Sequence, residues 1–340
     1  MGEGMSNRVG KQSFCFSNLP AIVSGATIAG PEEGKGPLAA SFDWILDEPL
    51  FGEKTWEMAE RKMLEESAKL ALRKVNLQPQ DVEFFLAGDL LNQIISANYA
   101  ARGLEIPFIG LFGACSTFVE ALLLGAMLVD GGFARRVLLA SSSHHMTAER
   151  QFRFPIEQGV QRPLYSQWTV TVSGALLLDA EGNGPRVVQG TMGKVVDLGV
   201  SDINNMGAAM APAAADTILT HFQDTGTNPD SYDLIITGDL GEIGSASLLK
   251  LLRMRGYDLE GKLQDCGLLI YDREKQDVHA GGSGCGCAAG VFTAWFLNKM
   301  REGLYHKILF LATGALMSPT SSQQGETIPA VAHAAVISAG

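Results

Sequence analysis

The sequence places one cysteine where a thiol could act as a nucleophile. Cys115 follows an apolar segment, residues 108–112, that is typical of a strand, and precedes an apolar segment, residues 118–129, that is typical of a helix. It therefore lies on a tight turn at a helix start, where unpaired backbone N–H groups and the helix dipole favour a thiolate. The turn predicts a nucleophile or an anion-binding corner, and a small buried apolar thiol is the alternative.

Acyl transfer on a cysteine also requires a base and an oxyanion hole. Histidine is the usual base, and the chain has six histidines. His144 and His145 follow a predicted strand and are the candidates to approach Cys115, although a structural role for them is equally open. His221 and His306 lie in polar surroundings, which predicts that both are solvated.

The elements that must position Cys115 occur twice along the chain. Residues 77–90 align without a gap on residues 227–240, so that Gly88 falls on Gly238 and Asp89 on Asp239. A glycine-rich turn before a long apolar helix also occurs twice, and each helix is followed by a hydrophobic strand and a closing strand. In order, these paired segments are residues 110–117 and 281–288, 136–140 and 307–311, and 171–179 and 330–338.

Strands that alternate with helices in two copies predict an α/β architecture with helix-covered sheets. The two copies are expected to share one interior, because each exposes helices that only the other can cover. The polar, glycine-rich residues 181–185 divide the chain into an N-terminal half, residues 1–183, and a C-terminal half, residues 184–340. A helix over residues 210–222 is predicted to carry Pro212 in its first turn.

Charge and composition exclude several classes of protein. With 26 Lys+Arg against 37 Asp+Glu, the net charge of −11 argues against general nucleic-acid binding, which needs a clustered basic face. No apolar run approaches the roughly 20 residues that span a bilayer, and the first eleven residues lack the apolar stretch of a secretory signal. The five cysteines fit no disulfide framework, which predicts free thiols in a reducing compartment.

These segments together resemble the thiolase superfamily, which includes β-ketoacyl synthases, and within it the stage V sporulation protein AD family of spore-forming bacteria. Five segments in order carry the resemblance over nearly the whole chain: residues 87–92 (AGDLLN), 111–117 (LFGACST), 147–153 (TAERQFR), 210–216 (MAPAAAD) and 280–285 (AGGSGC). The resemblance implies a thiolase-like fold in which two pseudo-duplicated halves with mixed sheets form five layers, α-β-α-β-α. It also implies a homodimer in which a strand near residues 108–112 pairs across the two-fold axis.

The resemblance further implies a function in sporulation and germination. The family takes up pyridine-2,6-dicarboxylic acid (dipicolinic acid) into the developing spore, so the expected ligand is this acid, as its calcium chelate. Membrane-embedded proteins of the same operon are the expected partners, in a channel or transport complex. The expected location is the periphery of the forespore or spore inner membrane, inside the cell. No cofactor is expected beyond Ca²⁺ with the ligand.

The sequence departs from the condensing members of the superfamily at two positions. Where they place a histidine after the strand that corresponds to residues 234–237, this chain has Asp239. Where they place a histidine or asparagine before the second buried helix, it has the glycine-rich turn 281–284, and His279 is in an unfavourable register. A positioned base and hydrogen-bond donors each contribute about 10²–10⁴-fold to such a reaction. We therefore expect a binding protein, not an enzyme, with Cys115 as a vestigial nucleophile.

Backbone amides, hydroxyls, aromatic faces and arginines are the predicted contacts for the acid. Phe112 or Trp168 could stack on the pyridine ring, and Arg150 or Arg153 could bind a carboxylate in a bidentate manner. Asp239 could contact Ca²⁺, or could, like Asp89, simply anchor loop backbone. The complete predicted set is Phe112, Cys115, Ser116, Thr117, His145, Arg153, Trp168, Asp239, Gly282 and Ser283.

Two other functions stay open at this point. The first is an acyl-transfer or β-ketoacyl-synthase-like condensing enzyme that uses Cys115, with His144 or His145 as an unusual base. The second is a scaffold whose surface recruits membrane proteins and whose pocket is vestigial.

Overall fold

A computed structural model describes residues 7–152 and 161–340 of the chain. Ten strands of the described residues form the body of one large mixed sheet, in the order β5-β4-β6-β8-β2-β9-β14-β13-β10-β11. In the N-terminal half these are β2 (Ala21–Ala29), β4 (Phe84–Gly88), β5 (Phe108–Gly110), β6 (Arg136–Ser143) and β8 (Val172–Asp179). In the C-terminal half they are β9 (Arg186–Met192), β10 (Leu234–Thr237), β11 (Leu263–Asp265), β13 (Lys307–Ala315) and β14 (Ala330–Ser338).

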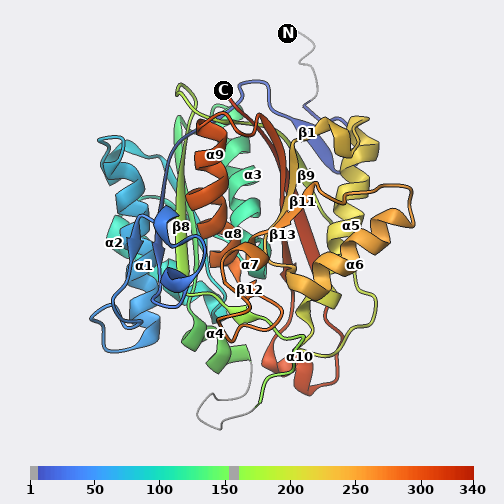
Figure 1. Cartoon of the computed structure of the whole chain (residues 1–340). Helices are drawn as coiled ribbons and strands as arrows, with labels where there is room; N and C mark the ends of the chain where they lie inside the picture. Colours follow the sequence, from blue (N-terminus) through green and yellow to red (C-terminus); the bar gives the residue numbers. More distant parts are fainter. Residues whose placement is uncertain (1–6, 153–160) are drawn as a thin grey trace.

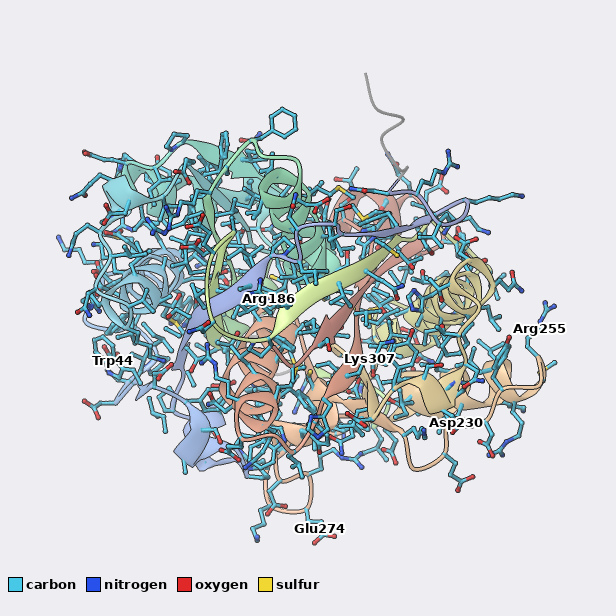
Figure 2. The ribbon with its side chains drawn as sticks, turned by 90° about the horizontal axis from the view of Figure 1, so that it is seen from above. Trp44, Arg186, Asp230, Arg255, Glu274 and Lys307 are labelled. Atoms are coloured by element: carbon cyan, nitrogen blue, oxygen red, sulfur yellow. The ribbon has the colours of Figure 1, made fainter. Side chains whose placement is uncertain are left out.

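The internal repeat predicted from the sequence is confirmed by the pairing of these strands. In each half the central strand, β4 or β10, pairs in parallel with two neighbours, β5 and β6 or β11 and β13. Antiparallel pairing then completes each half. In the first half β8 pairs with β6 and with β2, and in the second half β14 pairs with β13 and with β9. The halves meet where Ala21 of β2 pairs with Arg186 of β9, and Arg186 lies near the centre of the molecule in Figure 2.

Short strands extend this framework at its edges. β1 (Ser13–Cys15) pairs with β9, and β3 (Trp44–Ile45) pairs with β2. β7 (Trp168–Thr169) and β12 (Gly282–Ser283) form a separate parallel ribbon that links the two halves beneath the sheets.

Helices cover both faces and fill the space between the two halves of the sheet (Figure 1). α1 (Trp56–Arg73) and α2 (Ile95–Leu104) form one outer layer, and α5 (Met206–Thr225) and α6 (Gly241–Arg253) form the other. α3 (Thr117–Asp130), α8 (Cys285–Val291) and α9 (Leu297–Arg301) lie in the middle, with a π turn (Phe292–Phe296) joining the last two. The shorter helices are α4 (His145–Phe152), α7 (Cys266–Leu269) and α10 (Pro319–Gln323). The predicted five layers are confirmed.

The position of each helix follows from its apolar surface. α1 begins at Thr55, whose side chain accepts a hydrogen bond from the backbone N–H of Met58, and it buries one face that includes Leu64 and Ala68. α3 contacts both halves of the sheet and is apolar on nearly all sides, which is typical of a helix with no solvent-facing surface. This central helix therefore fixes the turn that precedes it, and that turn contains Cys115.

Two sequence predictions about α5 are wrong. The helix begins at Met206, capped by the side chain of Asn205, so Pro212 lies in its interior and not in its first turn. His221 is fully buried and not solvated, because the helix turns this residue toward the sheet. Its ring lies 2.7 Å from both Thr191 Oγ1 and the Tyr232 hydroxyl, and burial lowers the pKa of His221 to about 4. His306 is exposed, as predicted.

Two further predictions concern membrane-spanning helices and the state of the cysteines. In the part of the chain that the structure describes, no helix combines the length and apolar character needed to cross a membrane. All five cysteines fall within that part, and all five are free thiols, as their spacing predicted.

Candidate functional site

Cys115 lies on a strained turn, a single 3₁₀ turn (Ala114–Ser116) between β5 and α3. Ala114 has a φ of +50°, a left-handed conformation that is unfavourable for a residue with a side chain. Local hydrogen bonds hold the turn, because Ser116 Oγ donates to the carbonyl of Gly113 at 2.7 Å and Thr117 Oγ1 donates to the carbonyl of Ala114 at 2.7 Å. The two hydroxyls that were predicted to bind ligand are thus engaged within the turn itself.

Of the two alternatives for Cys115, its environment favours the buried neutral thiol over the thiolate. The side chain is buried, with 5% of its surface exposed. Burial is the main cause that raises the pKa of Cys115 well above its ordinary value, and the adjacent carboxyl of Asp239 raises it further. A hydrogen bond from the backbone N–H of Gly284 opposes this effect without overcoming it. The positive end of a helix therefore does not decide the charge of a thiol that is enclosed next to an acid.

Asp239 is the acid that faces Cys115, and it is completely buried after the end of β10. Its Oδ2 accepts hydrogen bonds from the backbone N–H of Gly284 at 2.8 Å and from Ser283 Oγ at 3.2 Å. Its Oδ1 has no nitrogen or oxygen donor among the described residues. Burial raises the pKa of Asp239 to about 7, so that near neutral pH this carboxyl is partly protonated.

Asp89, the repeat partner of Asp239, is used differently. Its two oxygens accept hydrogen bonds from the backbone N–H groups of Leu91, at 2.8 Å, and Ala97, at 2.7 Å. The expected anchoring role therefore describes Asp89 fully. Asp239 anchors the Ser283–Gly284 turn with Oδ2 only, and its carboxyl also has a hydrogen bond with the Cys115 thiol.

A small cavity of about 40 Å³ lies over the Cys115 thiol. That is about the volume of one water molecule in the liquid, which is roughly 30 Å³. Cys115, Thr169 and Ser283 supply polar groups, and the remaining lining is apolar: Leu90, Phe112, Ala114, Ala148, Phe152, Ile203, Met206, Ala315 and Met317. Phe112 is half-exposed and marks the surface end of the cavity.

The structure brings together part of the predicted ligand set. Cys115, Phe112 and Ser283 line the cavity, and Asp239 lies directly behind the thiol and Ser283. Gly282 is in the β7–β12 ribbon, where its carbonyl accepts a hydrogen bond from Gln167, and it does not line the cavity.

Trp168 and His145 lie together beside the cavity and not in its wall. Their rings stack at 3.6 Å with an interplanar angle of 7°, and the guanidinium of Arg162 lies 4.8 Å from the ring centre of Trp168. Neither face of Trp168 is thus open to a ligand in the cavity. Arg150 pairs with Glu57 at the surface, and Arg153 falls outside the described residues.

None of the residues that line the cavity in the described part of the chain is a histidine. The ring of His144 lies 2.9 Å from the carbonyl of Pro49, and burial lowers the pKa of His144. His279 contacts Pro163 and Asp277 on another surface. No imidazole among the described lining residues therefore contacts the thiol, and the titratable group beside it is the carboxyl of Asp239.

The sequence analysis missed most of the apolar lining, although the topology contains a signal for it. Leu90, Phe112, Ala148 and Met317 follow β4, β5, β6 and β13, four strands that run parallel within their halves. Carboxyl ends of parallel strands lie at one edge of a sheet, where α/β proteins commonly bind ligands. The loops after predicted strands are thus where further site residues could have been sought.

A second buried acid near the cavity was also missed. Glu60 of α1 accepts hydrogen bonds from Ser142 Oγ at 3.2 Å and Thr147 Oγ1 at 2.7 Å, and it is fully buried. Burial, and secondarily the nearby charge of Asp89, raises the pKa of Glu60 to about 8. Its position on a helix with several charged residues gave no sign of this burial.

Residues 10–338 match the family described as Stage V sporulation protein AD, which is nearly the entire chain. The chain belongs to the stage V sporulation protein AD family. The Stage V sporulation protein AD of Bacillus subtilis (strain 168) is 50% identical to it over 327 residues, which cover 96% of each chain. The family assignment made from five sequence segments is confirmed, and this is a sporulation protein.

Solved structures of condensing enzymes share the fold of this family member. The 3-oxoacyl-[acyl-carrier-protein] synthase III of Aquifex aeolicus VF5 is 13% identical, with a TM-score of 0.59 over 94% of this chain and 99% of that one. The corresponding synthase of Xanthomonas oryzae pv. oryzae KACC10331 is 12% identical, with a TM-score of 0.61 over 95% and 100%. Cerulenin-bound OleA of Xanthomonas campestris is 14% identical, with a TM-score of 0.61 over 95% and 98%. The predicted thiolase-like fold is confirmed.

Proposed function

We propose that this chain binds dipicolinic acid without condensing acyl groups, and that this binding serves uptake of the acid into the developing spore. The observation that carries the proposal is that Cys115 faces the carboxyl of Asp239, with no histidine in the cavity wall that the structure describes. A buried neutral thiol is a weak nucleophile, and the imidazole base that usually activates such a thiol is missing from the described lining. A partly protonated Asp239 can, however, donate a hydrogen bond to a ligand carboxylate.

The cavity offers a flat anion both apolar walls and polar groups. The pyridine ring would lie between Phe112 and the methionines Met206 and Met317, and a carboxylate would reach the hydroxyls of Thr169 and Ser283. A dicarboxylated ring needs more room than about 40 Å³, so these side chains must move when it binds. Methionine side chains adapt readily to such a change, because they are unbranched and flexible.

Calcium would enter this site with the ligand. Among the described residues, no group of three or more His, Cys, Asp or Glu side chains could hold a metal ion. Asp239 Oδ1 has no nitrogen or oxygen donor, so it can approach a cation that is already chelated by the pyridine dicarboxylate. Chelation also removes the repulsion that a free dianion would meet at an ionised Asp239.

We also propose that the chain acts as a homodimer beside the membrane-embedded proteins of its operon, at the forespore or spore inner membrane. β5 is the outermost strand of its half of the sheet, and Ile109 on it is 36% exposed. An edge strand with unpaired backbone groups favours pairing with a second copy.

Replacing Cys115 with methionine is expected to weaken binding of pyridine-2,6-dicarboxylate at least tenfold, because the longer side chain fills the cavity. Calorimetry with and without Ca²⁺ measures this, and Cys15→Ser is the matched control, since Cys15 lies on β1 far from the site. Benzene-1,3-dicarboxylate, which lacks the ring nitrogen, should bind without calcium dependence. Unchanged affinity in the Cys115→Met protein would show that the ligand does not use this cavity.

An apolar wall around a thiol also suits an acyl chain, so acyl transfer from Cys115 is the second candidate function. Mass spectrometry after incubation with an acyl thioester separates the two. We expect no adduct, and a stable acyl group on Cys115 would overturn the proposal of a non-catalytic site. A scaffold with a vestigial pocket would instead leave spore dipicolinate content unchanged in the Cys115→Met strain.

Replacing Asp239 with asparagine is expected to abolish the calcium-dependent part of the affinity and to leave the calcium-free part within about threefold. Asparagine can still accept the hydrogen bonds from Ser283 and Gly284, but it carries no charge for the cation. Calorimetric titrations at matched Ca²⁺ concentrations test this. The role of Asp239 as a calcium contact would be wrong if both proteins gained equally from Ca²⁺.

A further inference from the structure

A surface cleft of about 580 Å³ lies outside the Cys115 cavity and has an arginine and a histidine in its wall. It is lined by Gln161, Arg162, Pro163, Leu164, Asp277 and His279. The side chains of Arg162 and His279 are only 20% and 18% exposed, whereas the side chain of Asp277 between them is 80% exposed. Two largely enclosed hydrogen-bond donors, one of them a guanidinium, thus face one exposed carboxylate.

Arg162 is held in place independently of the carboxylate of Asp277. Its guanidinium lies over the ring of Trp168, and its Nη2 donates to the backbone carbonyl of Asp277 at 2.7 Å. Its Nη1 is buried and has no acceptor among the described residues. The arginine therefore faces the cleft with Nη2, the nitrogen that also meets Asp277.

His279 is oriented by the backbone and by Asp277. Its Nδ1 lies 2.9 Å from the carbonyl oxygen of Pro163 and 3.5 Å from Ser166 Oγ, and its Nε2 lies 2.9 Å from Asp277 Oδ1. The Asp277 carboxylate can only accept, so Nε2–H donates to it. The backbone φ of +49° at His279 is a strained value that the surrounding chain maintains.

We infer that Arg162 and His279 form a second carboxylate-binding site, which Asp277 occupies when no ligand is bound. In this arrangement Asp277 Oδ1 meets His279 and Oδ2 lies 3.2 Å from Arg162 Nη2, so one carboxylate spans both side chains. The side chain of Asp277 is 80% exposed, so little is lost when it turns to solvent and a ligand carboxylate replaces it. The ligand class is a small organic carboxylate whose apolar body lies on Pro163 and the exposed Leu164.

The β7–β12 ribbon connects this cleft to the Cys115 cavity. The backbone N–H of Ala280, next to His279, donates to the carbonyl of Ser166, and that of Trp168 donates to the carbonyl of Gly281. Gln167 Nε2 also donates to the backbone carbonyl of Asp239 at 2.8 Å. A carboxylate ligand would thus bind first in the cleft and then move into the adjacent Cys115 cavity. That dipicolinate is this carboxylate rests on the proposed function.

Asp277→Asn is the decisive variant. Loss of the competing charge is expected to tighten binding of pyridine-2,6-dicarboxylate at the cleft about tenfold. Asp258→Asn is the matched control, because Asp258 is also an exposed carboxylate paired with an arginine, Arg253. This pair lies close in the sequence to Arg255, which projects from the outer edge of the molecule in Figure 2. The two variants change the net charge equally, so an equal effect of both would overturn the inference.

His279→Asn is the complementary variant, in which the cleft is expected to lose affinity for the carboxylate ligand. Asparagine tolerates the left-handed backbone and can still donate to Pro163, but it removes the Nε2–H donor that faces Asp277. Binding at the cleft should fall at least fivefold. The imidazole NMR signals of His279, assigned by their loss in this variant, should shift during titration of the unaltered protein, and signals that do not move would contradict binding at the cleft.

Repeating the titrations in the Cys115→Met protein separates the two sites. Persistent shifts of His279 there, together with lost binding in the cavity, support both proposals. If Cys115→Met changes nothing and Asp277→Asn still tightens binding, the cavity is not the site and the cleft stands. If only Cys115→Met has an effect, the cleft inference is wrong and the cavity stands.

Discussion

Replacing Gly314 with alanine is expected to destabilise the protein by about 3 kcal/mol or more and to abolish ligand binding at Cys115. Gly314 lies in β13 directly against the turn that holds the cysteine, and a Cβ atom there would lie 1.9 Å from the carbonyl oxygen of Gly113. Both elements are buried backbone and cannot move as a flexible side chain would. Overpacking a tight interior commonly costs about 1–3 kcal/mol, and a clash between backbones lies at the upper end.

Chemical denaturation and calorimetry with pyridine-2,6-dicarboxylate measure the two effects of this change. Gly125→Ala is the matched control, because Gly125 lies in the neighbouring helix α3 and its added Cβ would meet only side-chain atoms, at 3.2 Å. The control should lie within about 1 kcal/mol of the unaltered protein. A stable Gly314→Ala protein that binds normally would show that the Cys115 turn tolerates displacement.

The free energy of unfolding is expected to fall as the pH rises from about 6.5 to about 8.5. Burial raises the pKa of Glu60 to about 8 and the pKa values of Glu33 and Asp239 to about 7. The folded chain therefore holds protons in this window that the unfolded chain has already released, so folding loses stability as these protons leave. Each such proton contributes a slope of about 1.4 kcal/mol per pH unit.

Replacing Glu60 with glutamine should reduce this slope, because the amide resembles the protonated acid and does not titrate. Urea denaturation at several pH values measures the slope. Glu181→Gln, at a glutamate whose side chain is 75% exposed, is the control and should keep the slope of the unaltered protein. A Glu60→Gln protein with an unchanged slope would mean that Glu60 does not hold a proton in the folded chain. Below pH 6.5 the buried His221 and His333 act in the opposite direction, because burial lowers the pKa of each to about 4.

Elements that depend on local pattern could be predicted from the sequence. The strand expected over residues 330–338 has those bounds in the structure, because its apolar run is buried on both faces. The paired glycine-aspartate segments likewise revealed the repeat, since Gly88 ends β4 and Gly238 follows β10, the corresponding strand. The predicted positions of Cys115, in the turn between a strand and a helix, and of Asp239, just after a strand, agree with the structure.

Properties that arise from distant contacts could not be predicted in this way. The charge state of Cys115 depends on enclosure by Asp239 and Gly284, more than a hundred residues away. Trp168 was expected to stack on a ligand, but its ring faces are covered by His145 and Arg162. Neither contact leaves a periodic trace in the sequence.

The different hydrogen bonding of the two repeated aspartates has a consequence for stoichiometry. The position related to the Cys115 site by the internal repeat contains Cys285 and Asp89. The Cys285 thiol donates to the carbonyl of Ser142, and both Asp89 oxygens accept hydrogen bonds from backbone N–H groups. That mirror position is filled by the protein's own groups. The two halves of the chain are related by a repeat, which alone would allow one ligand at the Cys115 site and a second at the mirror position. We therefore expect one bound ligand per chain at these two positions, and two in a dimer instead of four.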